Sequence, residues 1–587
     1  MIAVAAVVAV TLGAVGIGVW GVRLARTTSD LYVASRAISP WWNAAAISGE
    51  YLSAASFMGI AGLEMKLGAS ALWLPIGFAS GYLALLFFVA APLRRFGSYT
   101  IPDFCEARLG SPALRPIAAV VVLAIGGFYV VPQLKGAGLT LESIAGTPYW
   151  VGVVVVGAVV ALSVALGGMR GITYVQAYQY WVKTFGIALP ACLLLIYLGG
   201  LPERAALFGR ELPTAPAGGL TVKLDGPEEV EFPEATTYAI DGRQREAGAG
   251  EKTTLPEGTL LLPAGATVPV SEGTDPQRGG DWSRPVERKG DGPASPVFVY
   301  SLLIATFLGT MGLPHILVRF YTNRDGYAAR RTTVRVLGLL GIFYLFPAVY
   351  GALGRVLTPE LYVTGDTDSV VLELPQAAWP GAGGEILAAL TAAGAFAAFM
   401  STASGLLVSI SGTLSYDIGR RRRLRPPLER MAAFRRAAVI GMLVPALLAL
   451  LARGLDISVL VGWAFALAAS TFCPMLLLGI WWPRLTTRGA VLGMACGGAV
   501  ASVGIFTTLL AGPFDGTLGA ILAQPAVVSV PVAFCAMTLG SVLDPNRPRD
   551  ADARMLALHA PEGLGIDALR AGPATAEEVV VGGGGPR

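Results

Sequence analysis

Thirteen apolar runs follow one another along the chain, and shorter polar stretches separate them. A helical run of about 20 apolar residues matches the thickness of a bilayer's hydrocarbon core. The pattern therefore predicts an all-α polytopic membrane protein with about thirteen transmembrane helices, so that the two termini lie on opposite sides. The runs are centred near Val10, Ser53, Phe78, Ile125, Val159, Ile187, Thr306, Phe343, Phe399, Val444, Leu467, Val500 and Val530.

Basic residues alternate between the connecting loops and give this topology a direction. Short cytoplasmic loops collect Lys and Arg. Every second loop is rich in arginine, whereas the intervening short loops hold little beyond Lys66, Arg355 and Arg453. We expect an N-terminus outside, a C-terminus inside and a multi-pass location in the plasma membrane. The arginine-rich loops contain Arg23, Arg26, Arg36, Arg94, Arg95, Arg108, Arg170, Arg324, Arg330, Arg331, Arg420 to Arg423, Arg425, Arg484, Arg488, Arg547 and Arg549.

Composition supports the membrane prediction and excludes several functions. The chain is 54% hydrophobic and 14% charged, with a mean hydropathy of +0.62 and a formal net charge of +4, which is not the composition of an ordinary soluble enzyme. Five cysteines without ligand spacing and two histidines give no sign of a disulfide framework or a metal cluster. The sequence has no GxxxxGK[ST] segment, so nothing in it supports ATP-driven transport or an enzymatic activity. It gives no sign of a nucleic-acid partner; membrane lipid is the expected surrounding.

Two polar segments interrupt the apolar pattern. Residues 200–295 are rich in Gly, Pro, Glu and Arg, and their composition favours a poorly ordered extracellular insertion, although short strand-like pieces such as Leu220–Leu224 occur in it. Residues 544–587 are expected to form a disordered cytoplasmic tail. The predicted organisation is a first helix and loop (1–42), a five-helix repeat (43–199), the insertion (200–295), a second five-helix repeat (296–484), two further helices (485–543) and the tail (544–587).

The second predicted span is poor as a continuous membrane helix. Within it, Gly49, Ser53, Ser56 and Gly59 surround a carboxylate, Glu50. A broken helix survives in a membrane where protein or a polar cavity satisfies its backbone groups. With a break near residues 50–52, Ser53 would cap the restarted helix and free N–H groups would attract an anion such as a carboxylate. The freed carbonyls would suit sodium; alternatively, these small residues serve close helix packing.

A second span is interrupted in the same way. The stretch 306–316 places two glycines, Pro314 and His315 within one membrane crossing, and it opens the five spans that follow the long insertion. The segment around Ser53 opens the five spans before it. Paired interruptions at corresponding positions of two halves are typical of secondary transporters built from inverted repeats.

A third segment adds oxygen ligands. In the ninth span, Ala398, Ser401 and Thr402 lie on one helical face by their i, i+3 and i+4 spacing. Their hydroxyls, with the carbonyl of Ala398, could complete an oxygen cage around an ion, although serines in membrane helices commonly bond to their own backbone.

Together these segments resemble the sodium/solute symporter family, and most closely its cation/acetate symporter branch of monocarboxylate transporters. The resemblance covers nearly the whole chain apart from the insertion and the tail. Three stretches carry it: Gly49-Glu-Tyr-Leu-Ser-Ala-Ala-Ser-Phe-Met-Gly59, Gly312-Leu-Pro-His-Ile-Leu-Val-Arg-Phe-Tyr-Thr322 and Leu485-Thr-Thr-Arg-Gly-Ala490. The family resemblance implies a LeuT-type fold of five plus five helices.

The resemblance also implies site residues. It places one sodium ion among the carbonyls of Gly49, Leu52 and Ala398 and the hydroxyls of Ser401 and Thr402. Relatives with a second sodium carry an aspartate where this chain has Gln176, so one sodium per substrate is expected. Candidate substrate contacts lie on both broken helices and the eleventh span: Ser53, Ala55, Ser56, Gly312, Phe465 and Ser470.

Four charged or titratable residues lie in or near the predicted spans. Glu50 is expected to pair with a basic residue near the cytoplasmic end of its span. Lys135 is expected to snorkel outward, with a substrate carboxylate as the alternative partner. We expect His315 to brace the unwound backbone, although it could instead bind a carboxylate. Arg319 is expected to be an interfacial anchor or a gate element.

The sequence thus predicts a sodium-coupled symporter that imports acetate, propionate or pyruvate by alternating access. The apolar side chains of Phe57 and Phe465 suit a short alkyl chain. Two alternatives remain open: a symporter for another solute such as proline or pantothenate, and a membrane receptor that senses a solute without moving it.

Overall fold

The computed structural model describes residues 1–22, 38–199, 212–224, 226–271, 282–286, 295–418, 427–512, 514, 516–546, 550–561 and 564. Much of the predicted disordered tail after Asp544 and several of the arginine-rich loop residues lie outside this part of the chain. Residues Ala551–His559 of the tail form a helix, which corrects the expectation of disorder for that segment.

Long apolar helices form the bundle because their backbone groups are satisfied within each helix, as a bilayer requires. The first half comprises α1 (Ile2–Val22), α3 (Pro40–Tyr51), the π-helix η2 (Ala55–Gly59), α4 (Ile60–Leu67), the 3-10 helix η3 (Gly68–Leu72), α5 (Trp73–Phe88), α6 (Ala90–Phe96), α7 (Ile101–Leu109), α8 (Leu114–Ala145) and α9 (Tyr149–Tyr197).

The second half begins with α12 (Pro296–Thr310), α13 (Pro314–Phe320), α14 (Gly326–Phe343), α15 (Pro347–Leu357), α16 (Glu360–Thr364), η4 (Thr367–Ser369), α17 (Val370–Ala378), α18 (Ala382–Gly412) and η5 (Thr413–Asp417). It continues with α19 (Pro427–Leu451), α20 (Ile457–Ala469), α21 (Phe472–Trp481), α22 (Thr487–Ala511), α23 (Gly516–Ala523), α24 (Ala526–Val542) and α25 (Ala551–His559).

The described residues contain ten helical stretches long and apolar enough to cross a membrane, or eleven if α23 and α24, bent by 64°, form one span. Each of the thirteen predicted centres falls in one of the helices or, for Ser53, in the break that follows α3. Two centres share α9, whose 49 residues turn at Gly168, where φ is 55°. Glycine populates this region without the steric cost that a Cβ would bring. The number thirteen and the sides of the termini stay predictions.

The insertion is folded, which corrects the expectation of poor order for residues 212–271. Two antiparallel sheets, in the orders β1-β6-β3-β4 and β5-β2-β7, form a small module. Alternating side chains supply its core: Leu220 and Val222 of β1 pair with Leu262 and Leu260 of β6. The overall polar composition of the insertion predicted poor order, because an average over many residues does not record alternation. The alternation of apolar and polar residues is nevertheless present within the individual strands. The strands are β1 (Leu220–Leu224), β2 (Glu228–Phe232), β3 (Thr236–Ile240), β4 (Arg243–Ala247), β5 (Glu251–Leu255), β6 (Gly258–Leu262) and β7 (Val270–Ser271).

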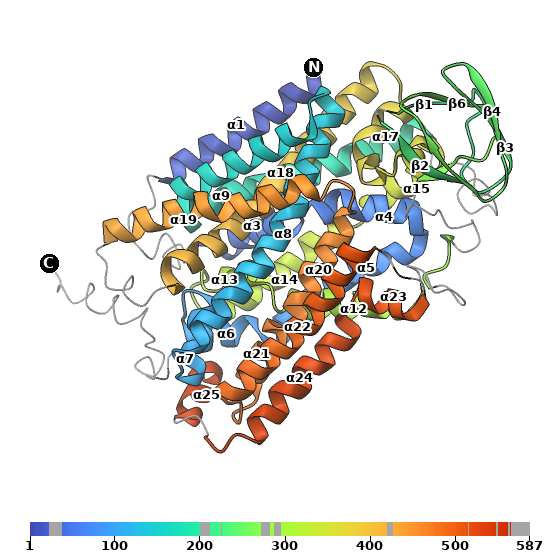
Figure 1. The fold of residues 1–587 in the computed structure, drawn as a ribbon. Helices are drawn as coiled ribbons and strands as arrows, with labels where there is room; N and C mark the ends of the chain where they lie inside the picture. The colour runs from blue at the N-terminus through green and yellow to red at the C-terminus, as the bar shows by residue number, and fades with distance from the viewer. Residues whose placement is uncertain are drawn as a thin grey trace.

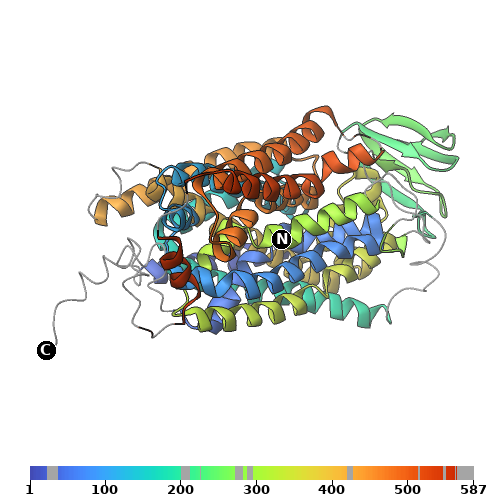
Figure 2. The same cartoon turned by 90° about the horizontal axis from the view of Figure 1, so that it is seen from below.

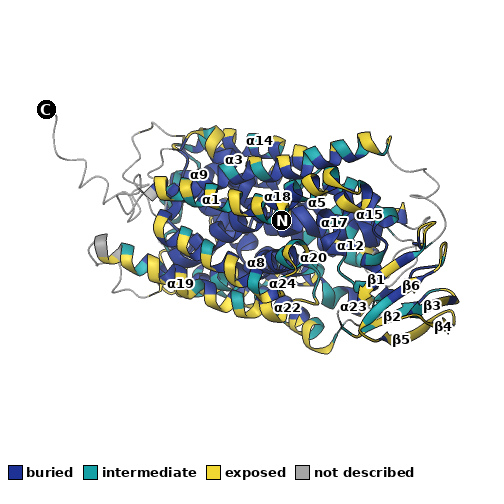
Figure 3. Ribbon diagram, turned by 90° about the horizontal axis from the view of Figure 1, so that it is seen from above, coloured by how far each residue is buried: buried dark blue, intermediate teal, exposed yellow. Residues whose placement is uncertain are grey.

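The β module lies at one end of the helical bundle, and α25 lies toward the other end (Figures 1 and 2). Strands β1, β2 and β7 pack against α16. The exposed residues lie mainly on the outer helices, while the centre of the bundle is buried (Figure 3). On α19, for example, Leu443, Val444, Leu447, Leu448 and Leu451 are exposed. Such a surface suits lipid, whereas the buried helices α18 and α20 form the interior that positions the site.

Candidate ion and solute site

The predicted break in the second span is present. Helix α3 ends at Tyr51, Leu52 leaves the helical region with ψ 88°, and the chain restarts as the π-helix η2. The amide of Ala54 donates to the side-chain oxygen Oε1 of Gln133 on α8 at 2.9 Å. Ser53 does not cap the restarted helix as expected: its buried hydroxyl has no hydrogen-bond partner among the described residues.

The second break is also present. Helix α12 ends at Thr310, Leu313 is extended with ψ 113°, and α13 begins at Pro314. Proline suits the first position of a helix because its missing N–H has no partner to lose there. The hydroxyls of Tyr51 and Thr310 lie 2.7 Å apart, so the ends of α3 and α12 meet at the two interruptions.

Helix α18 brings the predicted ion ligands to the first break. The Ser401 hydroxyl lies 2.6 Å from the carbonyl oxygen of Gly49 and 2.9 Å from that of Ala398. Thr402 donates its hydroxyl proton to the carbonyl of Glu50 at 2.6 Å. The five predicted ligands therefore gather where α3 ends against α18, and their oxygens have the chemistry that a sodium site needs.

A lysine that the sequence reasoning missed enters this oxygen set. The ammonium nitrogen of Lys183 on α9 donates to Gly49 O at 2.5 Å, to Leu52 O at 2.7 Å and to Ser401 Oγ at 2.6 Å. The side chain is fully buried. A lysine midway through an apolar run is itself a signal of function, and that signal could have identified Lys183 from the sequence.

Aromatic rings surround the region between the two breaks. Phe465 of α20 lies 4.8 Å from Phe78 and 5.6 Å from Tyr129 between ring centroids, and Tyr51 packs edge-on against Tyr82. We call these five residues the aromatic cluster. Ser56 in η2 joins its edge through a 3.2 Å contact with the hydroxyl of Tyr344, whose ring stacks on Phe78.

Besides Ser53, the side chains of His315 and Tyr82 at this cluster carry buried polar atoms that lack partners among the described residues. Both ring nitrogens of His315 are buried without a hydrogen bond, and its ring lies 5.4 Å from that of Tyr129. The hydroxyl of Tyr82 is likewise unpaired. Buried polar groups normally find a partner, so an unpaired histidine beside a broken helix is a candidate ligand-binding group. The expected bracing of the backbone by His315 nitrogens does not occur.

The other predicted substrate contacts are distributed less evenly. Ser53 and Ala55 are buried at the first break. A Cβ on Gly312 would lie 2.4 Å from the carbonyl oxygen of Ala468, so this glycine serves the close approach of the second break to α20. The Ser470 hydroxyl lies 2.7 Å from that of Ser529 on α24, and Phe57 packs against Phe343 on α14.

Glu50 is paired with a basic residue as expected, and the structure identifies that residue as Arg319. Arg319 Nε donates to Glu50 Oε2 at 2.5 Å, and its other nitrogens bind Thr173 and Gln176. Arg319 is fully buried, so it is not an interfacial anchor. The Gln176 amide donates in turn to the Ser401 carbonyl at 2.7 Å, which links this ion pair to the ion site.

Lys135 does not snorkel outward either. Its ammonium lies 3.5 Å from Asp368 Oδ2 and also bonds to the carbonyl of Leu455. Lys66 pairs with Asp456 at 3.0 Å. These two pairs join α8 and α4 to the segments around η4 and α20. The sequence could not show them, because the partners are more than 200 residues apart.

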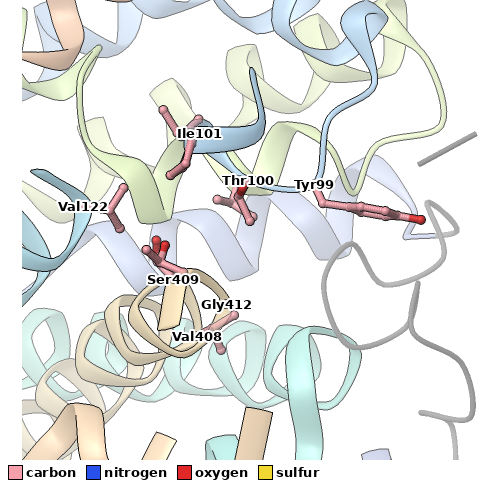
Figure 4. Close-up of a pocket in the computed structure, with 10 residues that line it drawn as sticks. Tyr99, Thr100, Ile101, Val122, Val408, Ser409 and Gly412 are labelled. Carbon is pink, nitrogen blue, oxygen red and sulfur yellow. The ribbon is translucent and has the colours of Figure 1, made fainter. Parts of the chain in front are cut away.

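A small pocket lies away from the aromatic cluster. Residues 99–102, which lead into α7, line it together with the end of α18, and Figure 4 shows Thr100, Val122, Ser409 and Gly412 around it. Val318, next to Arg319, contributes to the same lining.

The chain matches known proteins along most of its length. The profile of the sodium:solute symporter family matches residues 31–227 and 274–497. The uncharacterized symporter YwcA of Bacillus subtilis (strain 168) is 30% identical over 538 residues, which are 90% of this chain and 91% of that protein.

A solved structure shows the same fold. A sodium-coupled sialic acid symporter, in a substrate-bound outward-open state, superposes with a TM-score of 0.67 at 15% identity, covering 93% of this chain and 98% of that one. The expected LeuT-type arrangement is thereby confirmed. The family match and the apolar helices also confirm a multi-pass membrane protein. The matched family and the similar structure are transporters and not enzymes.

Proposed function

Because the chain belongs to the sodium:solute symporter family, whose membership supports sodium-coupled symport, we propose that it imports small monocarboxylates such as acetate, propionate and pyruvate by alternating access. The solute would lie at the aromatic cluster, between the two broken helices. Sodium would bind the carbonyls of Gly49, Leu52 and Ala398 and the hydroxyls of Ser401 and Thr402.

The observation that carries the substrate proposal is the unpaired His315 beside the aromatic cluster. An imidazole N–H can donate to a carboxylate, while the rings of Phe465 and Phe78 offer apolar contact to a short alkyl chain. A polyol would need several polar partners, because each buried hydroxyl left unpaired costs free energy. A small acid needs few.

The ion site supports coupling because it joins two elements. Gly49 and Leu52 belong to the first break and Ser401 to α18, so a cation held by all three favours the state in which these helices are together. A ligand shifts a conformational equilibrium through its differential affinity for the two states. Sodium bound there would favour the solute-binding state, and its release would free both helices.

Uptake into proteoliposomes tests the proposal. We expect labelled acetate, propionate and pyruvate to accumulate under an inward sodium gradient, with no comparable uptake of proline or pantothenate. His315→Leu, which removes both ring nitrogens, should lower uptake efficiency for the acids by about tenfold or more, since a charge-assisted hydrogen bond contributes about 1.5–3 kcal/mol. His559→Leu, the same change at the other histidine of the chain, which lies on α25, should leave uptake unchanged.

Three outcomes would contradict the proposal. Sodium-driven uptake of proline or pantothenate, without competition from monocarboxylates, would assign another solute. Equal uptake by the His315→Leu variant would show that His315 does not bind the carboxylate. Absence of counterflow exchange, despite saturable solute binding, would indicate a receptor instead of a transporter.

A further inference from the structure

Lys183 contacts three of the oxygens to which the proposed function assigns sodium. Its ammonium has three N–H donors, and each finds an acceptor: Gly49 O, Leu52 O and Ser401 Oγ. The nitrogen lies 2.5–2.7 Å from these atoms. A buried monovalent cation is thus already held by backbone carbonyls and a hydroxyl, which are the ligands expected for sodium at a broken helix.

No carboxylate oxygen is among the hydrogen-bond acceptors of this ammonium in the described part of the chain. Glu50, on α3, interacts with Lys183 electrostatically, but its Oε2 accepts from Arg319 of α13. On the other side, α18 contributes the neutral side chains of Ser401 and Thr402. The charge of Lys183 is therefore stabilised chiefly by oxygen dipoles, as the charge of a bound sodium ion would be.

The ammonium and a sodium ion exclude each other sterically and electrostatically. Two unit positive charges a few ångströms apart repel strongly in a buried site, and the same lone pairs would have to serve both cations. Lys183 lies on α9, whereas the oxygens lie at the end of α3 and on α18, so withdrawal of its side chain would not itself require these elements to separate.

We propose that the Lys183 ammonium and sodium are alternative occupants of one site, so that the lysine is a tethered competitor of the coupling ion. Sodium binds after the side chain has withdrawn, and the ammonium returns when sodium leaves. In the sodium-free state Lys183 holds α3 against α18, and it weakens the affinity of the site for sodium. This inference rests on the proposed sodium site and does not depend on which solute is carried.

Sodium binding to the purified protein tests the inference without any solute. Retention of ²²Na⁺ and the rise of the unfolding temperature with sodium would be measured at constant ionic strength with choline as the replacement cation. We expect Lys183→Ala to lower the sodium concentration for half-saturation by tenfold or more relative to the natural protein. Lys183→Ser, which supplies a small polar side chain, should do the same and serves if the alanine variant does not fold.

Two further variants locate the effect. Adding Ser401→Ala to Lys183→Ala should abolish the gain, because it removes an oxygen of the same site. Lys66→Ala removes another buried ammonium, one that pairs with Asp456 far along the chain, and should leave the half-saturating sodium concentration unchanged.

Unchanged or weaker sodium binding in both Lys183 variants would overturn the inference, as would a gain that survives Ser401→Ala. Because these measurements use no solute, they stand apart from the uptake test. A wrong substrate assignment would leave the tighter sodium binding of the Lys183 variants intact.

Discussion

The ion pair between Glu50 and Arg319 is the most deeply buried charged contact beside the site. Both side chains are essentially inaccessible, and Arg319 also binds Thr173 and Gln176. Removing one partner of such a pair leaves an uncompensated charge, whereas neutralising both removes the attraction and the desolvation cost together. The pair thus fixes α13 of the second break against α3 of the first.

Arg319→Met should therefore destabilise the protein by about 3–5 kcal/mol, since Glu50 would be left buried and unpaired. The double variant Glu50→Gln with Arg319→Met should recover most of that loss. Unfolding temperature in detergent and the monodisperse fraction after purification measure both effects. If Arg319→Met were as stable as the natural protein, the ion pair would not be a structural link between α13 and α3.

At the scale of elements, helices α3 and α9 approach closely next to the ion site. A Cβ on Gly49 would lie 2.3 Å from the carbonyl oxygen of Gln176, so the two backbones meet there without an intervening side chain. This approach brings Lys183 of α9 within reach of the Gly49 and Leu52 carbonyls. Small residues that let membrane helices come together are a common feature of their interfaces.

Gly49→Ala should push α3 away from α9 and cost about 1–3 kcal/mol, because the obstacle is backbone that cannot rotate aside. It should also weaken sodium binding, since two carbonyls of the site move with α3. Gly127→Ala on α8 is the matched control, because a Cβ there meets nothing within 4 Å. Equal unfolding temperatures for the two variants would argue against the close approach.

At the scale of the whole molecule, acidic residues concentrate where the β module meets the helical bundle. Glu360 of α16, Asp366 just before η4 and Glu373 of α17 lie outside the membrane-spanning helices. Burial, with Glu360 and Asp366 nearby, raises the pKa of Glu373 from 4.5 to about 7. Burial and the neighbouring Asp366 also raise the pKa of Glu228 in β2.

The raised pKa of Glu373 predicts a pH-dependent stability. The folded protein keeps a proton that the unfolded chain releases, so the free energy of unfolding falls as pH rises from about 4.5 to about 7. The Glu373→Gln side chain does not titrate, so this variant does not lose stability through that group as pH rises. At pH 8 it should be more stable than the natural protein by about 1–2 kcal/mol, after allowance for solvent screening, and nearly equal at pH 5. Parallel unfolding curves for the two proteins across this range would refute the prediction.

The sequence by itself determined the features that are local or periodic. Apolar runs of span length fixed the helices, and glycine, proline and serine within two runs marked both breaks, because backbone exposed in a membrane needs special surroundings. The i, i+3 and i+4 spacing placed Ala398, Ser401 and Thr402 on one face. That these residues lie beside Gly49 and Leu52 was predicted from the family resemblance and not from the spacing.

Only the tertiary structure decided which distant groups meet. In the folded chain Arg319 pairs with Glu50, and Lys135 pairs with Asp368. The Ser470 hydroxyl contacts that of Ser529 on α24, and the amide of Ala54 donates to Gln133. Above all, the tertiary structure placed the Lys183 ammonium on the oxygens assigned to sodium. These contacts join residues tens to hundreds of positions apart, and no local period along one chain records which helix faces which.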